Sequence, residues 1–149
     1  MKSCYDFDEN ILSFGVKSGL TIDLRFRGNK TILYGDSGIG KSLIVTLLSG
    51  IQADKSWLAL YNADNIVLLK NNNIAEIYKA NRKLIIIDRG ERIITDNIVS
   101  KINSDGANRY LIMIRKSFGF DVSPNHYATL IRENNTLKLN YKFSVRGWN

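Results

Sequence analysis

The amino-acid sequence predicts an α/β fold: a mainly parallel β-sheet flanked by helices, with one β-hairpin before it and another after it. Three observations lead to this prediction. Short, almost entirely apolar runs recur along the middle of the chain, segments of helical pattern separate them, and alternating apolar and polar residues mark both ends. Strands that are buried on both faces and alternate with helices are typical of a parallel sheet.

The two ends of the chain alternate with the period of a strand that has one buried face. Near the amino terminus, residues 11–16 and 20–26 alternate on either side of a short polar segment, which favours a hairpin. Near the carboxyl terminus, residues 128–132 and 137–143 alternate on either side of Asn134-Asn135. Paired asparagines suit a tight turn, so we expect a second hairpin there.

The central part of the chain supplies the parallel strands and their helices. The strands are predicted at the apolar runs 31–34, 66–69, 84–87 and 110–114. The helices are predicted at 41–49, ending at Gly50 as a carboxyl-terminal cap, at 74–80, and at 96–103 after the capping residue Thr95.

Length and composition indicate one globular domain spanning residues 1–149. Hydrophobic residues make up 44% of the chain and charged residues 23%, close to the averages for soluble globular proteins. No apolar run approaches the roughly 18 residues that span a membrane, and the start has no apolar core of a secretion signal. Cys4 is the only cysteine, which excludes an internal disulfide and a thiolate zinc cluster. We therefore expect a cytoplasmic protein with no membrane span.

The chain is basic, with a formal charge of +7 and a pI near 9.6. A positive surface favours contact with polyanions, which makes nucleic acid one candidate partner. However, the 21 basic residues are scattered, and a phosphate-binding site would itself account for some of them. The charge alone does not assign a partner.

The most specific motif is G-x-x-x-x-G-K-[ST], which lies between a predicted strand and a predicted helix. It consists of Gly35, Asp36, Ser37, Gly38, Ile39, Gly40, Lys41 and Ser42. The glycines allow backbone N–H groups to approach phosphate oxygens, and the helix that follows points its positive end at them. Lys41 would contact the β- and γ-phosphates, and the Ser42 hydroxyl would bind Mg²⁺. The motif predicts binding of a nucleoside triphosphate with magnesium.

A second motif is the apolar run 84–87 followed by Asp88. A carboxylate at the end of a buried strand is a suitable ligand for Mg²⁺, either directly or through water. Many buried strands also end in aspartate because the next turn favours it. Its position downstream of the phosphate-binding motif favours the magnesium role, together with Ser42.

These two motifs resemble the Walker A and Walker B motifs of the P-loop NTPases, over roughly residues 31–117. The strand order resembles the ATPase branch that includes AAA+, RecA-like and ABC proteins. The resemblance implies the P-loop NTPase fold, ATP and Mg²⁺ as ligands, and ATPase activity. The sequence contains neither D-x-x-G nor N-K-x-D, the guanine-recognition motif of small GTPases. We therefore expect ATP to be favoured over GTP.

The same resemblance suggests roles for two further residues. Arg115 follows the fourth predicted strand, where this branch places a residue that senses the γ-phosphate; the alternative is a solvated strand end. Phe14 lies before the phosphate-binding motif at about the distance where ABC-type proteins stack an aromatic residue on adenine. Its place in an alternating strand equally suits a core residue, and this alternative is favoured.

The residue after Asp88 is Arg89, where hydrolysing members of the branch commonly have a glutamate that polarises the attacking water. Glu91 is the nearest substitute, and the alternative is an ordinary surface charge. If Arg89 faces the site, it would offset charge on the γ-phosphate or act on a neighbouring subunit. We therefore expect slow turnover.

Three functions remain open at this point. The first is an ATPase, slow or activated by a partner, whose nucleotide state drives a conformational change. The second is a nucleotide-binding regulatory module that does not hydrolyse ATP, and the third is a small kinase. The partner would be another protein or a second copy of the chain.

Overall fold

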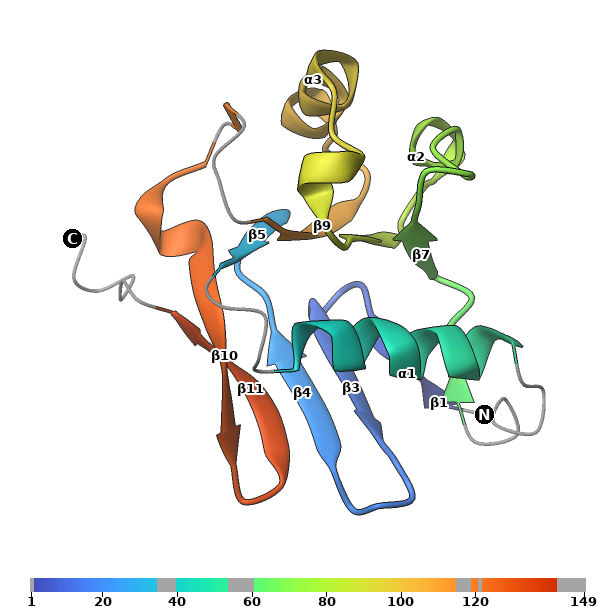
Figure 1. The fold of residues 1–149 in the computed structure, drawn as a ribbon, viewed down its shortest axis with the longest axis vertical. Coiled ribbons are helices and arrows are strands. Elements are labelled where there is room, and N and C mark those ends of the chain that lie inside the picture. The colour runs from blue at the N-terminus through green and yellow to red at the C-terminus, as the bar shows by residue number, and fades with distance from the viewer. Residues whose placement is uncertain (1, 35–39, 54–60, 115–118, 121, 142–149) are drawn as a thin grey trace.

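The computed structural model describes residues 2–34, 40–53, 61–114, 119–120 and 122–141. Within them, one nine-stranded mixed sheet has the order β2-β3-β4-β11-β10-β5-β9-β8-β7 (Figure 1). Its strands are β2 (Tyr5–Asp6), β3 (Ile11–Gly15), β4 (Thr21–Arg25), β5 (Lys30–Leu33), β7 (Ile66–Leu69), β8 (Leu84–Ile87), β9 (Arg109–Met113), β10 (Tyr127–Glu133) and β11 (Thr136–Tyr141). The α-helices are α1 (Lys41–Ala53), α2 (Glu76–Lys79) and α3 (Asp96–Ser104), and the 3₁₀ turns are η1 (Gly90–Arg92) and η2 (Pro124–His126).

The sheet combines parallel and antiparallel pairings. Five neighbouring strands, β10-β5-β9-β8-β7, run parallel to one another. The hairpin pairs β3-β4 and β10-β11 are antiparallel, as is β2-β3. The two hairpins join each other through a parallel pairing of β4 with β11, in which Ile22 lies opposite Leu137. Both hairpins are therefore part of one continuous sheet.

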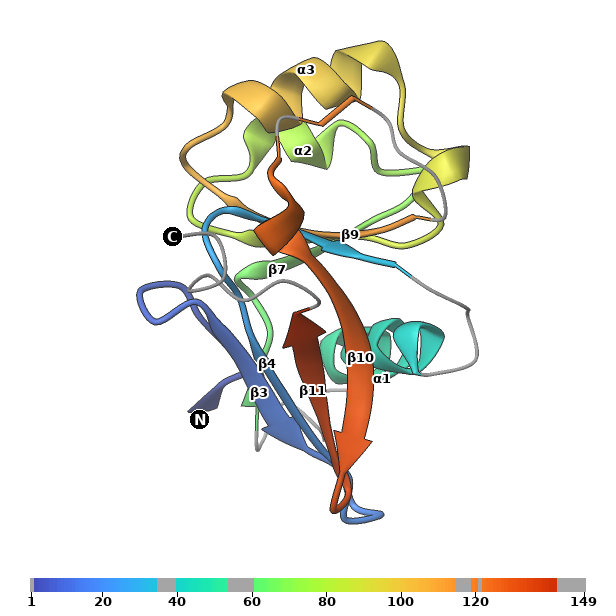
Figure 2. The same cartoon turned by 90° about the vertical axis from the view of Figure 1, so that its left-hand side faces the viewer.

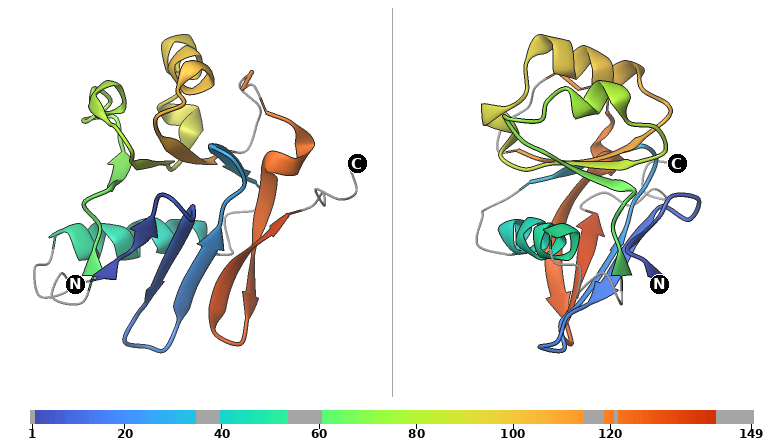
Figure 3. Two further views of the ribbon diagram at one scale, coloured as in Figure 1. Left: turned by 180° about the vertical axis from the view of Figure 1, so that it is seen from behind. Right: turned by 90° about the vertical axis from the view of Figure 1, so that its right-hand side faces the viewer.

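The sheet is so strongly curved that it nearly closes on itself. Strand β1 (Lys2–Ser3) comes just before the edge strand β2 in the chain, and β6 (Tyr61–Asn62) comes just before the other edge strand, β7. Strands β1 and β6 pair with each other and so link the two ends of the sheet. The side chain of Asn65 donates a hydrogen bond of 2.7 Å to the Tyr5 carbonyl oxygen across the same gap. The views in Figures 2 and 3 show α1 lying along the concave side, with the hairpins and the parallel strands around it.

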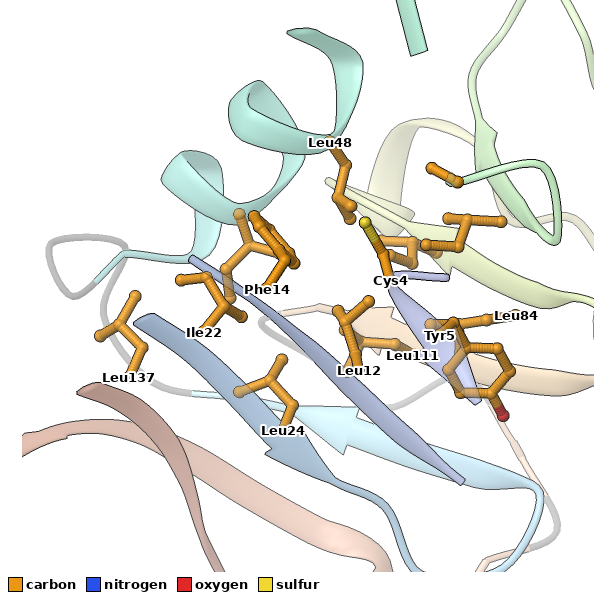
Figure 4. Packing of buried hydrophobic residues seen from close by; sticks show 14 of the residues in the cluster. Cys4, Tyr5, Leu12, Phe14, Ile22, Leu24, Leu48, Leu84, Leu111 and Leu137 are labelled. Carbon is orange, nitrogen blue, oxygen red and sulfur yellow. The ribbon is translucent and has the colours of Figure 1, made fainter. Parts of the chain in front are cut away.

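Two hydrophobic cores hold this arrangement together. The concave core packs α1, through Ile44, Leu48 and Ile51, against residues from both halves of the sheet (Figure 4). The convex core packs α2 and α3, through Ile77, Ile98 and Ile102, against the opposite face of the parallel strands. The strands between the two cores are apolar on both faces, which is why the sequence shows unbroken apolar runs there.

The individual elements confirm much of the sequence prediction. The strands predicted at 31–34, 66–69, 84–87 and 110–114 are β5, β7, β8 and β9, and both predicted hairpins are present. The turn between β10 and β11 has Asn134 and Asn135 with φ of 49° and 65°, as a tight hairpin turn requires. Thr95 caps α3 by accepting a hydrogen bond from the Ile98 N–H at 3.3 Å.

The predicted fold class is nevertheless wrong. The chain does not form a mainly parallel sheet flanked by helices with a hairpin at each end; it forms a mixed, nearly closed sheet with few and short helices. The reason lies in strand pairing. Alternation shows which face of a strand is buried but not which strand lies beside it. Here short parallel pairings, of β10 with β5 and of β11 with β4, make both hairpins part of the sheet.

The resemblance to the P-loop NTPases is corrected by the same finding. It implied a parallel sheet with helices covering both faces, whereas the structure is mostly β and places antiparallel hairpins within the sheet. The second predicted helix is a single turn, since α2 spans only Glu76–Lys79. The chain is therefore not assigned to that family, and the names Walker A and Walker B do not apply to its motifs.

Helix α1 also differs from the prediction, because it continues through Gly50 to Ala53. Its last turn buries Ile51 against the concave core. The side chain of Gln52 donates hydrogen bonds to the carbonyl oxygens of Ala63 at 3.2 Å and Ile66 at 2.8 Å. These tertiary contacts offset the low helix propensity of Gly50, so this glycine does not end the helix.

A buried polar cluster fixes the start of β9. Asp105 accepts hydrogen bonds from Asn108 at 2.8 Å, from the Tyr110 hydroxyl at 2.5 Å and from the Ala107 N–H at 2.8 Å. Burial acts to raise the pKa of Asp105, but these hydrogen bonds and the nearby Lys101 outweigh it, so the pKa lies below its ordinary value. The ionised carboxylate thus stabilises the fold.

Replacement of Asp105 by asparagine is expected to lower the free energy of unfolding at neutral pH by about 1–3 kcal/mol. The NH₂ group of the new amide would face hydrogen-bond donors and could not accept from them. Since a lowered folded-state pKa stabilises the protein above the ordinary aspartate pKa, the wild type should lose stability as pH falls below about 4. Asp105→Asn should lose less stability than the wild type over the same range of pH. Urea unfolding at several pH values measures both effects, with the exposed Asp64→Asn as the control. Equal pH dependence in the two variants would contradict this role.

Candidate functional site

The candidate site lies at the edge where the parallel strands end. Strand β9 lies between β5 and β8 in the sheet. Its residue Met113 lies opposite Leu33 of β5, and its residue Ile112 lies opposite Ile87 of β8. The residues that follow β5 and β8 therefore leave the sheet at the same level. They are separated by one strand, which corresponds to roughly 10 Å. Tyr34, which follows β5, and Asp88, which follows β8, therefore share this edge.

The start of α1 supplies the first part of the site. Gly40 has φ of 88°, a left-handed conformation that favours glycine, and an added Cβ would lie 3.3 Å from the Leu137 side chain. The Gly40 carbonyl accepts a hydrogen bond of 3.1 Å from the Ile44 N–H, which begins the helix. Lys41 is 8% exposed, and Ser42 is exposed beside it. The other predicted phosphate-binding residues, Gly35, Asp36, Ser37, Gly38 and Ile39, lie outside the described residues.

The turn after β8 supplies the second part. Asp88 is half-buried, and Arg89 is exposed with φ of 53°, a left-handed conformation that is uncommon for arginine. Gly90 is buried, and a Cβ there would lie 2.5 Å from Ile114 and 2.7 Å from Ile94. The Arg89 carbonyl accepts a hydrogen bond of 2.9 Å from the Arg92 N–H. Packing and hydrogen bonding together hold this turn in one shape.

A pocket of about 230 Å³ lies between α1 and the ends of β7 and β8. Its apolar side is formed by Val45 of α1 and by strand residues, and its polar side by the segments that follow the strands. The lining residues are Val45, Leu68, Leu69, Lys70, Asn71, Ile86, Asp88, Arg89, Arg92 and Ile93. Val45 lies one helical turn after Lys41, so the pocket adjoins the start of α1.

Two of the predicted site residues do not line this pocket. Phe14 is 2% exposed in the concave core, where its ring packs edge-on against Tyr61 with 6.2 Å between ring centroids (Figure 4). Glu91 is half-buried in η1 and is not among the residues that line the pocket. The third, Arg115, lies outside the described residues. The pocket thus brings the helix of Lys41 close to Asp88 and Arg89.

The sequence analysis missed the contribution of Lys70, Asn71 and Arg92. A signal for the first two was present, because Lys70-Asn71 follows the apolar strand β7 just as Asp88-Arg89 follows β8. Parallel neighbours end at the same edge of a sheet, so polar residues after adjacent strands are expected to lie close together. Arg92 gave no such signal, since its position depends on the turn at Gly90.

Comparisons of the chain with protein-family models, curated proteins and solved structures found no match. The description of the site therefore depends on the sequence motifs and on the geometry. Among the described residues, no helix has the length and apolar character needed to cross a membrane.

Proposed function

We propose that this protein binds a nucleoside triphosphate with Mg²⁺, ATP in preference to GTP, at the edge where β5 and β8 end. The start of helix α1 carries the proposal. Gly40, in a left-handed conformation, directly precedes the 13-residue helix, which begins with the buried Lys41 and the exposed Ser42. In the sequence, these residues end the glycine-rich segment that follows β5. Free N–H groups and the positive end of the helix dipole attract phosphate. Lys41 adds a full positive charge at the same place.

Magnesium suits the oxygen ligands on this edge. The Ser42 hydroxyl is exposed at the start of α1, and the Asp88 carboxylate lies half-buried at the pocket. Mg²⁺ is usually held by one or two such protein oxygens together with phosphate oxygens and water. A bound ion would supply charge that offsets the negative triphosphate. The protein's own contribution is to hold both oxygen ligands at one end of the sheet.

Hydrolysis should be slow in the isolated protein. Arg89 follows Asp88, and the next carboxylate along the chain, Glu91 in η1, is not among the residues that line the pocket. No described group in the pocket other than Asp88 can accept a proton from water readily, because the remaining polar residues are Lys70, Asn71, Arg89 and Arg92. Positioning and charge would still support some turnover, and a protein partner or second copy could raise it.

The test is to replace Asp88 by asparagine and to titrate ATP in the presence of Mg²⁺ or EDTA. The amide keeps the shape of the carboxylate but loses its charge, so ATP affinity with Mg²⁺ should fall about 10-fold while affinity in EDTA stays within about two-fold. Asp64→Asn is the matched control, because Asp64 is an exposed carboxylate before β7, at the opposite end of the strands.

The same samples test nucleotide preference and turnover. ATP should bind at least as tightly as GTP, and phosphate release by the wild type should be well below about 10 per second, a typical enzyme rate. An equal effect of Asp88→Asn with Mg²⁺ and with EDTA would show that Asp88 is only structural. If neither nucleotide binds the wild type, the proposed function is wrong.

A further inference from the structure

The pocket beside Asp88 has the composition of a binding site in its own right. Its floor is apolar, formed by Val45 of α1, Leu68 of β7 and Ile86 of β8. Its rim is polar, formed by the residues that follow β7 and β8 and by η1. Ligand pockets typically combine an apolar lining with a few convergent polar groups in this way.

The rim is strongly unbalanced in charge. Lys70, Arg89 and Arg92 are cationic, and Asp88 is the only carboxylate among the described residues of the lining. Among the described residues, no ion pair or side-chain hydrogen bond engages these three cations, while salt bridges form elsewhere, as between Arg82 and Asp8. Cations that outnumber the counter-charges in a pocket attract an anion. The apolar floor favours an anion that also has an apolar part.

The backbone that carries these cationic residues is held by the fold around it, while their side chains are exposed. Lys70 and Asn71 come directly after β7, where the Asn73 side chain accepts a hydrogen bond of 2.6 Å from the Lys70 N–H. Arg89 and Arg92 are fixed on either side of Gly90, which has no room for a side chain. A backbone that is already ordered loses little conformational entropy when a ligand binds.

The size of the pocket limits the ligand. At about 230 Å³ it is smaller than the roughly 300–1,000 Å³ of sites that hold drug-sized molecules. A whole nucleotide is therefore too large for it, whereas a single ring with one charged group is of suitable size. Lys41 and Ser42 are not part of the lining, so the pocket adjoins the proposed triphosphate site and shares Asp88 with it.

We propose that this pocket binds a small organic anion, an apolar group of about one ring bearing a phosphate or carboxylate, as a second ligand beside the triphosphate. The proposal depends on the pocket and its cations and goes beyond the proposed function. The phosphate or carboxylate would contact Arg89, Arg92 and Lys70, and the apolar group would contact Val45, Leu68 and Ile86.

The test uses phenyl phosphate, benzoate and inorganic phosphate as probes in calorimetric titrations of the full chain. Phenyl phosphate should bind more tightly than inorganic phosphate, because only the former reaches the apolar floor; benzoate shows whether a carboxylate is also accepted. Arg92→Gln should weaken phenyl phosphate binding about 10-fold or more, as expected for loss of a charge-assisted hydrogen bond. Lys79→Gln, an exposed cation on α2, is the matched control and should have no effect.

Further measurements separate this proposal from the proposed function. Phenyl phosphate should bind with unchanged stoichiometry when the protein is saturated with Mg-ATP, and Arg92→Gln should leave Mg-ATP affinity within about two-fold of wild type. Binding of phenyl phosphate to a wild type that binds no ATP would support the pocket and refute only the triphosphate site. Displacement of phenyl phosphate by ATP, or the absence of saturation up to about 10 mM, would overturn the proposal.

Discussion

Replacement of Lys41 by alanine is expected to lower the affinity for Mg-ATP by about 100-fold or more. A hydrogen bond between a cation and a phosphate contributes up to about 3 kcal/mol, and the effect is larger where water is excluded. Lys41 is a buried residue, 8% exposed, at the start of α1, so little of its side chain is in contact with water. Fluorescence or calorimetric titration with Mg-ATP measures the change.

The burial of Lys41 makes a stability control necessary. The sequence suggested that the Lys41 side chain projects from the helix start into a ligand and not into the core. In the structure, Lys41 is one of the buried residues of α1. Lys41→Met, which keeps most of the apolar stem, and Lys79→Ala on α2 should be measured together with Lys41→Ala. Thermal unfolding then shows which variants are folded. An unchanged ATP affinity in a folded Lys41 variant would contradict the proposed function.

The sequence predicted the local structure well, because local structure depends on short patterns. Alternation predicted β3, β4, β10 and β11, and unbroken apolar runs predicted β5, β7, β8 and β9. Thr95 and the Asn134-Asn135 pair were recognised from chemistry that acts within a few residues. Each of these features is decided by a side chain and its nearest neighbours along the chain.

The architecture could not be predicted in the same way, since it depends on pairings between distant segments. The parallel pairing of Ile22 with Leu137 joins the two hairpins, and the pairing of Lys2 with Tyr61 brings the ends of the sheet together. No pattern within either partner specifies the other. The P-loop NTPase resemblance depended on motifs and strand order, and neither includes these pairings.

The candidate site was predictable only in part. Two short motifs at the start of a helix and the end of a strand predicted Lys41, Ser42 and Asp88 as site residues, and their role stays a prediction. The pocket was not predicted, because it requires Val45 of α1 to lie beside residues that follow β7 and β8. The role of Phe14 was left between adenine stacking and core packing, and its burial now favours the core.

Replacement of Phe14 by alanine is therefore expected to lower the free energy of unfolding by about 3–5 kcal/mol, the usual cost of removing a buried ring. The ring is 2% exposed and lies beneath α1 beside Ile22 and against Tyr61, so its loss would leave a cavity between the helix and the sheet (Figure 4). Urea unfolding measures this change. Tyr78→Ala is the control, because that aromatic side chain is 53% exposed and its loss should cost little.

The conservative variant Phe14→Leu separates packing from adenine stacking. Leucine keeps much of the buried volume, so this variant should remain folded with a smaller loss of stability, of about 1–2 kcal/mol. If Phe14 only packs the core, Mg-ATP affinity in Phe14→Leu should stay within about two-fold of wild type. If it stacked on adenine, affinity for ATP would fall by the equivalent of about 1–3 kcal/mol in a fully folded protein, while affinity for inorganic triphosphate would not change. That outcome would require Phe14 to leave the core when the nucleotide binds.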